Sequence, residues 1–254
     1  MGTKWDLEDL DTSFHQQGFA VLRQFFDAAK VIEINRRIEL YIKTILPGLP
    51  KEKAFYEDLD DSSTLMRLQG MEDQDSYFGE LYENPDILAL ARTFMGGGEV
   101  EPQTIQWFTK PARVGSETPP HQDGFYFKLD PNEAVTLWLA LDRVDEGNGC
   151  IRFLPGSNRR GMRPHQLSNV IGFSQGLTDY GPADLEAEVP VTLEPGDVTA
   201  HHCMTVHRAD ANESERPRRA LGFVFYAVGA SKDLQLREAQ QKQVMEAWKR
   251  EGKI

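Results

Sequence analysis

The sequence has few cysteines, no long apolar run and fewer basic than acidic residues. Cys150 and Cys203 are too few for a disulfide framework and favour a reducing compartment, which we expect to be the cytoplasm. No stretch approaches the roughly 18 apolar residues of a membrane-spanning helix, and the first residues lack the apolar core of a signal peptide. The 28 basic residues stand against 40 acidic ones, a net charge of −12. This balance argues against nucleic acid and against an anionic membrane as partners.

What the sequence does contain is the composition of a globular protein. Hydrophobic residues make up 40% and charged residues 27% of its 254 residues, so the chain can bury a core without covalent staples. No internal repeat, low-complexity stretch or linker interrupts it. We therefore predict one domain over residues 1–254, and leave its oligomeric state open.

The first 98 residues are expected to be mostly helical. Asp27 is a candidate N-cap, Gly18 ends one helical pattern, and Pro85 stands at the first position of another. These signals predict helices over 6–17, 27–46 and 84–95. Residues 19–26 are expected to be extended. The acidic, turn-rich stretch 50–83 is expected to form loop and short helix over a surface or at the mouth of a site.

After Gly98 the pattern changes to short β-type runs separated by turns. Strands are expected over 99–109, 134–144, 150–154, 188–193, 198–200 and 220–228. Strands of this length and spacing favour a β-sandwich or barrel over residues 99–230. An amphipathic helix is expected to close the chain within residues 231–254. The predicted fold class is therefore mainly β with flanking helices.

Two of the six histidines occur in informative contexts. His121 and Asp123 follow two prolines, and at a strand end residues i and i+2 point to the same side, so the pair can chelate one metal ion. His207 ends the run GDVTAHHCMTVH and would complete a set of two imidazoles and one carboxylate. That set is the facial triad of non-haem Fe(II) oxygenases, which leaves coordination positions open. Each motif taken alone is more often structural than metal-binding.

A basic cluster, Arg216-Pro217-Arg218-Arg219, opens the predicted strand at 220–228. A planar guanidinium can hold a carboxylate through two hydrogen bonds. Arginines at a strand end more often face solvent, so this motif alone does not identify a site.

Together, the order and spacing of these motifs resemble the phytanoyl-CoA dioxygenase (PhyH-like) family of Fe(II)- and 2-oxoglutarate-dependent oxygenases. The matching stretches are FTKPARVGSETPPHQDGFY, VTLWLALDRVDEGNGCIRFLPGSNRRG, EPGDVTAHHCMTVHRADANESERPRRALGFVFY and the opening FHQQGFAVLRQFFD. The resemblance covers most of the chain and is weakest over residues 47–90. It implies a double-stranded β-helix, or jelly roll, with helices packed on its outside.

The resemblance also assigns roles to residues. It implies that His121, Asp123 and His207 bind Fe(II), and that His202 lies outside the metal shell. The 2-oxoglutarate arginine of the family falls on Arg218, eleven residues after His207. Two further positions near this cosubstrate match Lys110 and Trp138. Ala209 departs from the pattern, because the family often has there a serine that assists cosubstrate binding, so that contact is lost or replaced.

The chemistry implied by the resemblance consumes 2-oxoglutarate and O2 and releases succinate and CO2 while a substrate C–H bond is hydroxylated. Desaturation or ring closure is not distinguished from hydroxylation by the sequence. Related halogenases have Gly or Ala at the position of Asp123, where a halide then binds. The carboxylate is present here, so we predict oxygenation and not halogenation.

The substrate is expected to be a small molecule. Gln106 and Phe108 share the strand parity of Lys110, and an aromatic run follows the metal pair, so the candidate pocket residues are Gln106, Phe108, Phe125 and Phe127. Acidic residues at 57–61 and 72–75 could line the entrance and would disfavour a polyanion such as an acyl-CoA, although such a run is more often a solvated face. The long stretch 160–188 is a candidate lid.

Two alternatives remain open at this point. A cupin-like metalloenzyme that does not use 2-oxoglutarate would share the His121, Asp123 and His207 triad and would not need Arg218. A non-catalytic small-molecule-binding barrel is the other alternative, and the intact triad argues against it.

Overall fold

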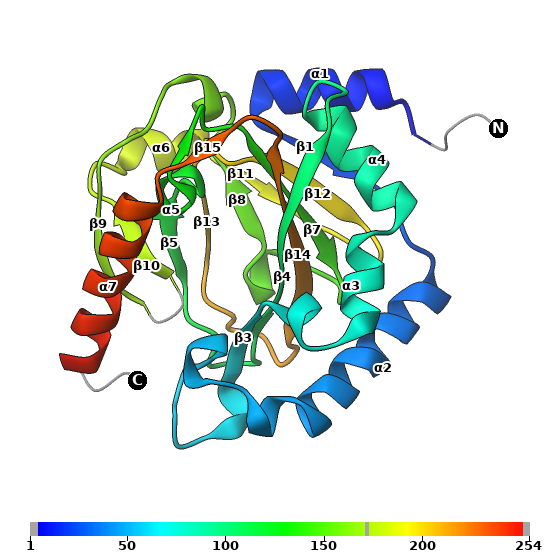
Figure 1. Cartoon of the computed structure of the whole chain (residues 1–254), viewed down its shortest axis with the longest axis vertical. Helices are drawn as coiled ribbons and strands as arrows, with labels where there is room; N and C mark the ends of the chain where they lie inside the picture. The colour runs from blue at the N-terminus through cyan, green and yellow to red at the C-terminus, as the bar shows by residue number, and fades with distance from the viewer. Residues whose placement is uncertain (1–4, 171–172, 251–254) are drawn as a thin grey trace.

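The computed structural model describes residues 5–170 and 173–250, and its central feature is a pair of antiparallel sheets (Figure 1). In the larger sheet the strand order is β1 (Phe19–Leu22), β12 (Val198–His202), β7 (Ala134–Ala140), β14 (Arg218–Ala227), β4 (Val100–Lys110), β3 (Leu65–Gln69) and β2 (Ala54–Tyr56). In the smaller sheet the order is β11 (Val189–Val191), β8 (Ile151–Phe153), β13 (His207–Ala209) and β5 (Thr118–His121).

The two sheets pack face to face around a shared interior. Phe153 on β8 reaches across to the other sheet, where its ring lies 4.5 Å from that of Phe19 and 5.3 Å from that of His201. The face of each sheet that looks toward the other is called its inner face below. This closure forms the expected jelly roll, the double-stranded β-helix core.

The central strand β14 shows how the sequence separates the two faces of the larger sheet. Leu221, Phe223 and Phe225 point outward and are buried. Gly222 and Val224 alternate with them, point inward and line a cavity. A Cβ at position 222 would lie 3.0 Å from the ring of Phe108 on β4, so a larger residue there would need that ring to shift.

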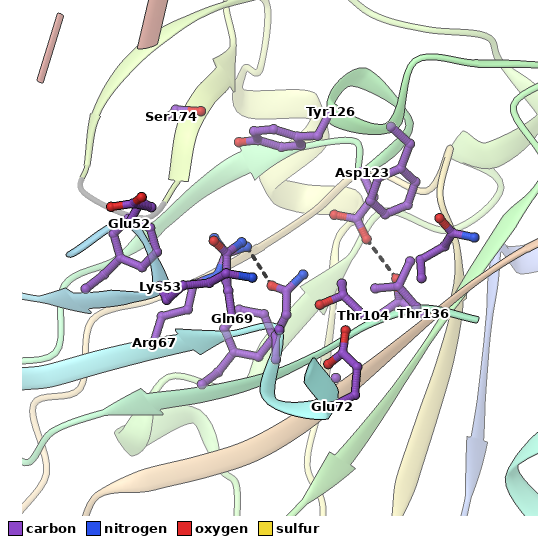
Figure 2. A pocket seen from close by; sticks show the side chains of 18 of the residues that line it. Glu52, Lys53, Arg67, Gln69, Glu72, Thr104, Asp123, Tyr126, Thr136 and Ser174 are labelled. Atoms are coloured by element: carbon purple, nitrogen blue, oxygen red, sulfur yellow. Dashed lines mark hydrogen bonds between the residues drawn. The ribbon is translucent and has the colours of Figure 1, made fainter. Parts of the chain in front are cut away.

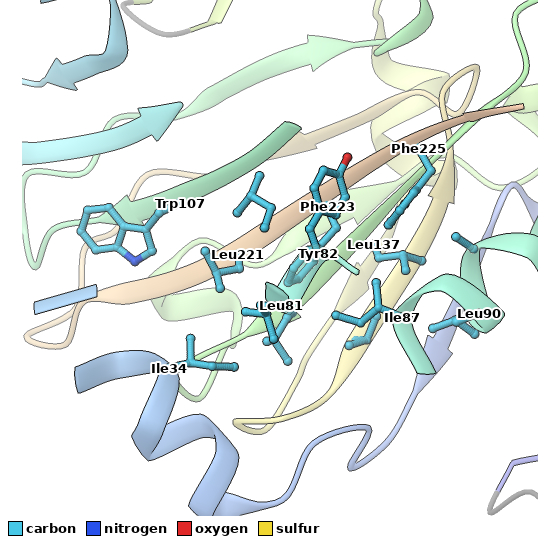
Figure 3. Close-up of a cluster of buried hydrophobic side chains, with 14 of the residues drawn as sticks. Ile34, Leu81, Tyr82, Ile87, Leu90, Trp107, Leu137, Leu221, Phe223 and Phe225 are labelled. Carbon is cyan, nitrogen blue, oxygen red and sulfur yellow. The ribbon is translucent and has the colours of Figure 1, made fainter. Parts of the chain in front are cut away.

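Helices cover the outer face of the larger sheet (Figure 1). They are α1 (Leu7–Gln17), α2 (Ala28–Thr44), α3 (Ser76–Tyr82) and α4 (Pro85–Phe94). Figure 3 shows Ile34 of α2, Leu81 of α3 and Ile87 of α4 directed at the outward side chains of β14, and all belong to one buried hydrophobic cluster. This apolar layer is the main core of the described chain.

The starts of these helices follow from local capping. Asp6 accepts hydrogen bonds from the backbone of Glu8 and Asp9, and Asn84 caps α4 in the same way with Pro85 behind it. Gly18 ends α1 in the left-handed region, with φ of +89°. Asp27 caps α2, as predicted.

Two segments differ from the sequence-based expectation. The stretch 50–83, expected to be loop and short helix, contains β2 and β3 between single 3-10 turns, and both strands extend the larger sheet. The stretch 160–188, expected to be a long loop, contains a hairpin of β9 (His165–Val170) and β10 (Phe173–Leu177) followed by α6 (Pro182–Ala187). In the first stretch β3 becomes a strand by pairing with β4, which lies outside it, and a local pattern does not show that pairing. In the second stretch β9 and β10 pair with each other.

The remaining elements lie at the ends of the core. Helix α5 (Gly124–Phe127) follows β5 directly, and a small ribbon pairs β6 (Leu129–Asp130) with β15 (Ser231–Lys232). The closing helix α7 (Leu234–Arg250) confirms the expected C-terminal helix (Figure 1). Among the described residues, none of the helices combines the length and the apolar character needed to cross a bilayer.

Candidate metal centre

Two side chains from neighbouring strands and one from the turn after β5 meet on the inner face of the smaller sheet. His121 ends β5, His207 begins β13, and the two residues are paired directly across the ladder. The ligand atoms of His121, Asp123 and His207 all lie within 4.8 Å of one another. Asp123 reaches the group differently from what we expected, because β5 ends at His121 and the backbone at Asp123 is already helical, with φ of −57° and ψ of −35°.

The imidazoles of the triad are oriented for metal binding by backbone carbonyls. Nδ1 of His121 lies 2.8 Å from the carbonyl oxygen of Pro119, and Nδ1 of His207 lies 3.0 Å from that of Thr205. A carbonyl accepts only, so in both rings Nδ1 carries the proton and Nε2 presents its lone pair. Burial, and then the nearby His121 and His201, hold the pKa of His207 well below its usual range, so this ring is neutral.

The carboxylate of Asp123 is held by two donors on its far oxygen. Oδ2 accepts hydrogen bonds from Oγ1 of Thr136 at 3.0 Å and from Nε2 of His201 at 3.2 Å. Oδ1 faces the other two ligands, 3.5 Å from Nε2 of His121 and 3.9 Å from Nε2 of His207. Burial raises the pKa of Asp123, but the neighbouring imidazoles of His121, His201 and His207 outweigh burial and hold that pKa well below its usual range. The group is therefore an anion with one oxygen left for a cation.

The donor set fits a divalent iron ion. Two neutral imidazole nitrogens and one carboxylate oxygen make a triad that leaves room for further ligands on the cavity side. The supporting hydrogen bonds to all three side chains are of the kind that fixes ligand orientation in metal sites. His201 and Thr136 are the members of this group that the sequence did not reveal.

A group of buried basic side chains lies further along the inner face of the larger sheet. Arg218 begins β14 and pairs with Lys110 at the end of β4, and both side chains are buried. The guanidinium carbon of Arg218 lies 5.1 Å from the centroid of the Trp138 ring. Burial lowers the pKa of Arg218 to about 10, so it stays charged. The structure thus brings together the three residues predicted to bind the cosubstrate.

Two buried polar atoms in this group have no hydrogen-bond partner among the described residues, and they indicate which kind of ligand the group would bind. Nε of Arg218 and Oγ1 of Thr199, which pairs with Trp138 on the neighbouring strand, are buried without a hydrogen-bond partner among the described residues. A buried donor that lacks a partner costs free energy, and an oxygen-rich anion would remove that cost. The carboxylates of 2-oxoglutarate suit this group of side chains.

The other arginines of the same cluster point elsewhere. Arg216 donates to Asp145 at 2.7 Å, and Arg219 binds Asp142 through two nitrogens at 2.8 and 2.9 Å. Only Arg218 of the three faces the interior. Ala209, where a serine was expected, lies directly opposite Thr118 in the β13–β5 ladder, so a hydroxyl is available beside it.

A cavity of about 520 Å³ opens beside the triad. His121 and Asp123 form part of its wall, and three of the four predicted substrate residues, Gln106, Phe108 and Phe127, line it as well. Phe125 does not, because the turn of α5 directs its ring outward, where it stacks on His165 at 4.2 Å. Tyr126, between the two phenylalanines, does line the cavity.

The acidic segments divide between two positions. Glu72 and Asp73 line the cavity, together with Glu52 and Lys53 (Figure 2). Residues 57–61 do not line it. Glu57 accepts a hydrogen bond from the backbone of Ser116 at 2.7 Å, and Asp61 caps a 3-10 turn. Of the two acidic segments, only 72–75 therefore borders the site.

The β9–β10 hairpin closes one side of the cavity. Ser174 lines it, and the hydroxyl of Tyr126 both donates to the carbonyl of Gln175 at 3.0 Å and accepts from its N–H at 3.1 Å. The candidate lid thus contains an ordered hairpin tied to α5. Residues 171–172 of this stretch lie outside the described residues.

Comparison with known proteins places this site in context. A family model described as Phytanoyl-CoA dioxygenase (PhyH) matches residues 14–220. The chain is 24% identical over 228 residues to the peroxisomal phytanoyl-CoA dioxygenase of Bos taurus, a match that covers 84% of this chain and 66% of that protein. It is 32% identical over 123 residues to phytanoyl-CoA dioxygenase 1 of Oryza sativa subsp. japonica, 48% of this chain and 42% of that one. The chain thus spans about two thirds of the length of the bovine relative.

Solved structures with the same fold include two complexes. EvdO2 from Micromonospora carbonacea var. aurantiaca, complexed with 2-oxoglutarate, is 25% identical with a TM-score of 0.70, and the match covers 92% of this chain and 95% of EvdO2. The epimerase SnoN, in complex with Fe3+, alpha ketoglutarate and nogalamycin RO, is 23% identical with a TM-score of 0.70, over 89% of this chain and 85% of SnoN.

Proposed function

The chain belongs to the phytanoyl-CoA dioxygenase family, and we propose that it hydroxylates an unactivated C–H bond of a small-molecule metabolite with Fe(II), 2-oxoglutarate and O2. The observation that carries the proposal is the assembly of His121, Asp123 and His207, of which the first two line a cavity, in a core whose larger sheet carries the buried Arg218. A metal site with open positions beside an anion pocket is the arrangement this chemistry needs.

The triad would hold Fe(II) through Nε2 of His121, Nε2 of His207 and Oδ1 of Asp123. The bound iron supplies the oxidising chemistry, in which 2-oxoglutarate and O2 become succinate and CO2 and one oxygen atom converts a substrate C–H bond to an alcohol. The presence of the Asp123 carboxylate favours oxygenation over halogenation, because it occupies the position that a halide would take. Added chloride or bromide is expected to leave the product free of halogen, as mass spectrometry would show.

The chain's own residues position the cosubstrate and keep water out. Arg218 supplies positive charge for the distal carboxylate of 2-oxoglutarate, and the amine of Lys110 and the hydroxyl of Thr199 offer further hydrogen-bond donors beside it. Thr118 stands opposite Ala209 and takes the place of the missing serine hydroxyl. Phe108, Phe127 and the β9–β10 hairpin surround the cavity and limit the access of water.

The size of the cavity favours a metabolite over a coenzyme A thioester. About 520 Å³ lies within the roughly 300–1,000 Å³ of ordinary small-molecule sites. Glu52, Glu72 and Asp73 line it as well and would repel the phosphates of an acyl-CoA. Phytanoyl-CoA, which the names of the relatives contain, is therefore not proposed as the substrate of this chain. Location in the cytoplasm stays a prediction from the cysteine usage.

The test is an anaerobic titration of the metal-free protein with Fe(II) and 2-oxoglutarate. We expect a weak visible charge-transfer band for the chelate, followed by slow succinate formation when air is admitted. Arg218→Met should raise the 2-oxoglutarate concentration for half-saturation by about 100-fold, because a buried charged partner is lost. Arg216→Met, which removes an arginine of the same motif that faces Asp145, serves as the matched control.

The other outcomes point to the alternatives. Iron binding without the band, or a 2-oxoglutarate dependence unchanged in Arg218→Met, would favour a cupin-like metalloenzyme that does not use this cosubstrate. No iron binding at all would favour a non-catalytic barrel.

A further inference from the structure

The cavity beside the triad contains a guanidinium that neither the metal ligands nor the cosubstrate pocket use. Arg67 lies on β3, where it pairs with Phe108 of β4, and its side chain lines the cavity together with Gln69 and Gln106. Figure 2 shows Arg67 and Gln69 on the β3 side of this space, and Asp123 and Tyr126 on the side of α5. Arg67 and the candidate iron site therefore face the same ligand volume.

The surroundings of Arg67 fix the plane of its guanidinium. Nη2 donates to Oε1 of Gln106 at 2.5 Å, and the guanidinium carbon lies 5.9 Å from the ring centroid of Phe55 and 5.3 Å from that of Phe108. These three neighbours orient the cation, and the electrostatic influence of Tyr126 and Asp123 favours its charged form. Burial lowers the pKa of Arg67 to about 10, which leaves it charged at neutral pH.

We propose that Arg67 binds a carboxylate of the substrate, so that the substrates are small organic acids taken up as monoanions. This inference rests on the proposed function and adds the substrate class to it. A planar guanidinium held by ring faces and an amide is suited to a bidentate pair with a carboxylate. Arg67 would then hold the acid at one end of the cavity while its carbon chain extends toward His121 and Asp123, where a C–H bond is oxidised.

Acidic residues on the same cavity limit the charge of that substrate. Glu52, Glu72 and Asp73 line it, and Lys53 is paired with Asp73 at 3.6 Å. A molecule with one carboxylate satisfies Arg67 and keeps its remaining surface neutral or cationic toward these groups. A polyanion, or the dianion of a phosphate monoester, would meet like charges.

The experiment compares acids with their own amides. The iron-loaded protein is assayed for succinate with hexanoate, octanoate, phenylacetate and N-acetyl-leucine, each beside its primary amide, and with octyl phosphate. Succinate formed without any addition is recorded first, and it tests the proposed function alone. We expect at least one acid to stimulate succinate formation over this background, with its amide at least about tenfold less effective.

Variants then connect the preference to Arg67. Arg67→Met should raise the KM for the stimulating acid by about 100-fold and remove the acid-over-amide preference, while Arg67→Lys should keep the preference with a weaker KM. Arg37→Met is the matched control, because Arg37 also stacks on an aromatic ring, that of Tyr77 at 4.8 Å, but on exposed α2. Thermal melting of each variant establishes that it is folded.

The results separate two failures. If wild type forms no succinate with or without additions, the proposed function is wrong. If background succinate is formed but amides equal acids, no acid stimulates, octyl phosphate alone stimulates, or Arg67→Met keeps the preference, the substrate class inferred here is overturned.

Discussion

Asp123 divides its two oxygens between two roles, since Oδ1 faces the other ligands and Oδ2 is held by Thr136 and His201. His201 is 2% exposed, and its ring also lies 4.6 Å from that of His207. It is thus a positioning residue that touches two ligands of the proposed iron site. The sequence places His201 and His202 side by side and does not show which of them faces the site. Only the orientation of β12 turns His201 inward.

Replacing His201 should weaken iron binding. His201→Phe keeps the ring volume and removes the hydrogen bond to Oδ2 of Asp123, so we expect an Fe(II) Kd raised about 10- to 100-fold. Anaerobic titration of metal-free protein measures this. His202→Phe is the control, because His202 faces Glu133 at 3.2 Å on the other side of β12. Equal Fe(II) affinities in wild type and His201→Phe would contradict the role.

Lys110 gives the free energy of unfolding a dependence on pH. Burial, and then the charge of Arg218, lower the pKa of Lys110 from 10.5 to about 7 in the folded protein. Between pH 7 and 10.5 the unfolded chain therefore binds a proton at this lysine that the folded chain does not. Stability rises with pH wherever the unfolded state binds more protons, so Lys110 makes the apo-protein more stable at pH 9 than at pH 7.

Chemical denaturation at the two pH values tests this effect. Between pH 7 and pH 9 the free energy of unfolding of wild type should gain about 2 kcal/mol relative to Lys110→Met. Lys43→Met, which removes an exposed lysine on α2, should follow wild type. Parallel behaviour of wild type and Lys110→Met would show that Lys110 keeps its proton in the folded state.

One hydroxyl makes two hydrogen bonds that attach the β9–β10 hairpin to α5, beside the stack of Phe125 on His165. Tyr126→Phe removes both hydrogen bonds to the backbone of Gln175. We expect faster amide hydrogen exchange over residues 173–177 and a higher substrate KM, with the fold retained. Tyr41→Phe is the control, because the buried hydroxyl of Tyr41 has no hydrogen-bond partner among the described residues. Unchanged exchange in Tyr126→Phe would show that other contacts hold the hairpin.

Helices were predictable from sequence where their signals are local. Asp6, Asp27 and Asn84 cap the helices they were expected to start or precede, and Pro85 stands at the first position of α4. Strands β2 and β3 were not predictable, since such short segments become strands only through pairing, of β3 with β4 and of β2 with β3. The position of Arg67 was missed for the same reason. The triad and Arg218 were found because they match motifs of the family that stand at a fixed spacing along the sequence.

Across the whole molecule, the larger sheet separates stability from binding by its two faces. Phe225 is fully buried on the outer face under the helices, while Phe108 points inward and lines the cavity. Phe225→Ala should lower the free energy of unfolding by about 3–5 kcal/mol and leave the Fe(II) and 2-oxoglutarate affinities of the folded protein unchanged.

Phe108→Ala is expected to have the opposite effect, a change in substrate binding with little loss of stability. It removes a cavity wall and one ring beside Arg67, so substrate KM is expected to change more than stability. Denaturation curves and the succinate assay on both variants measure the separation. A loss of stability in Phe108→Ala as large as that in Phe225→Ala would show that the inner face also holds the fold together.

The triad, Arg218 and Lys110 lie on β5, β13, β14, β4 and the turn after β5, whereas Arg67, Phe55 and Ser174 come from β2, β3 and the β9–β10 hairpin. Part of the ligand choice thus belongs to stretches of the gene that encode no metal or cosubstrate residue. A duplicated copy can accumulate changes in codons 54–69 and 165–177 and acquire a new metabolite while it inherits the same reaction. We expect the chains that descend from such duplications to diverge fastest in these two stretches.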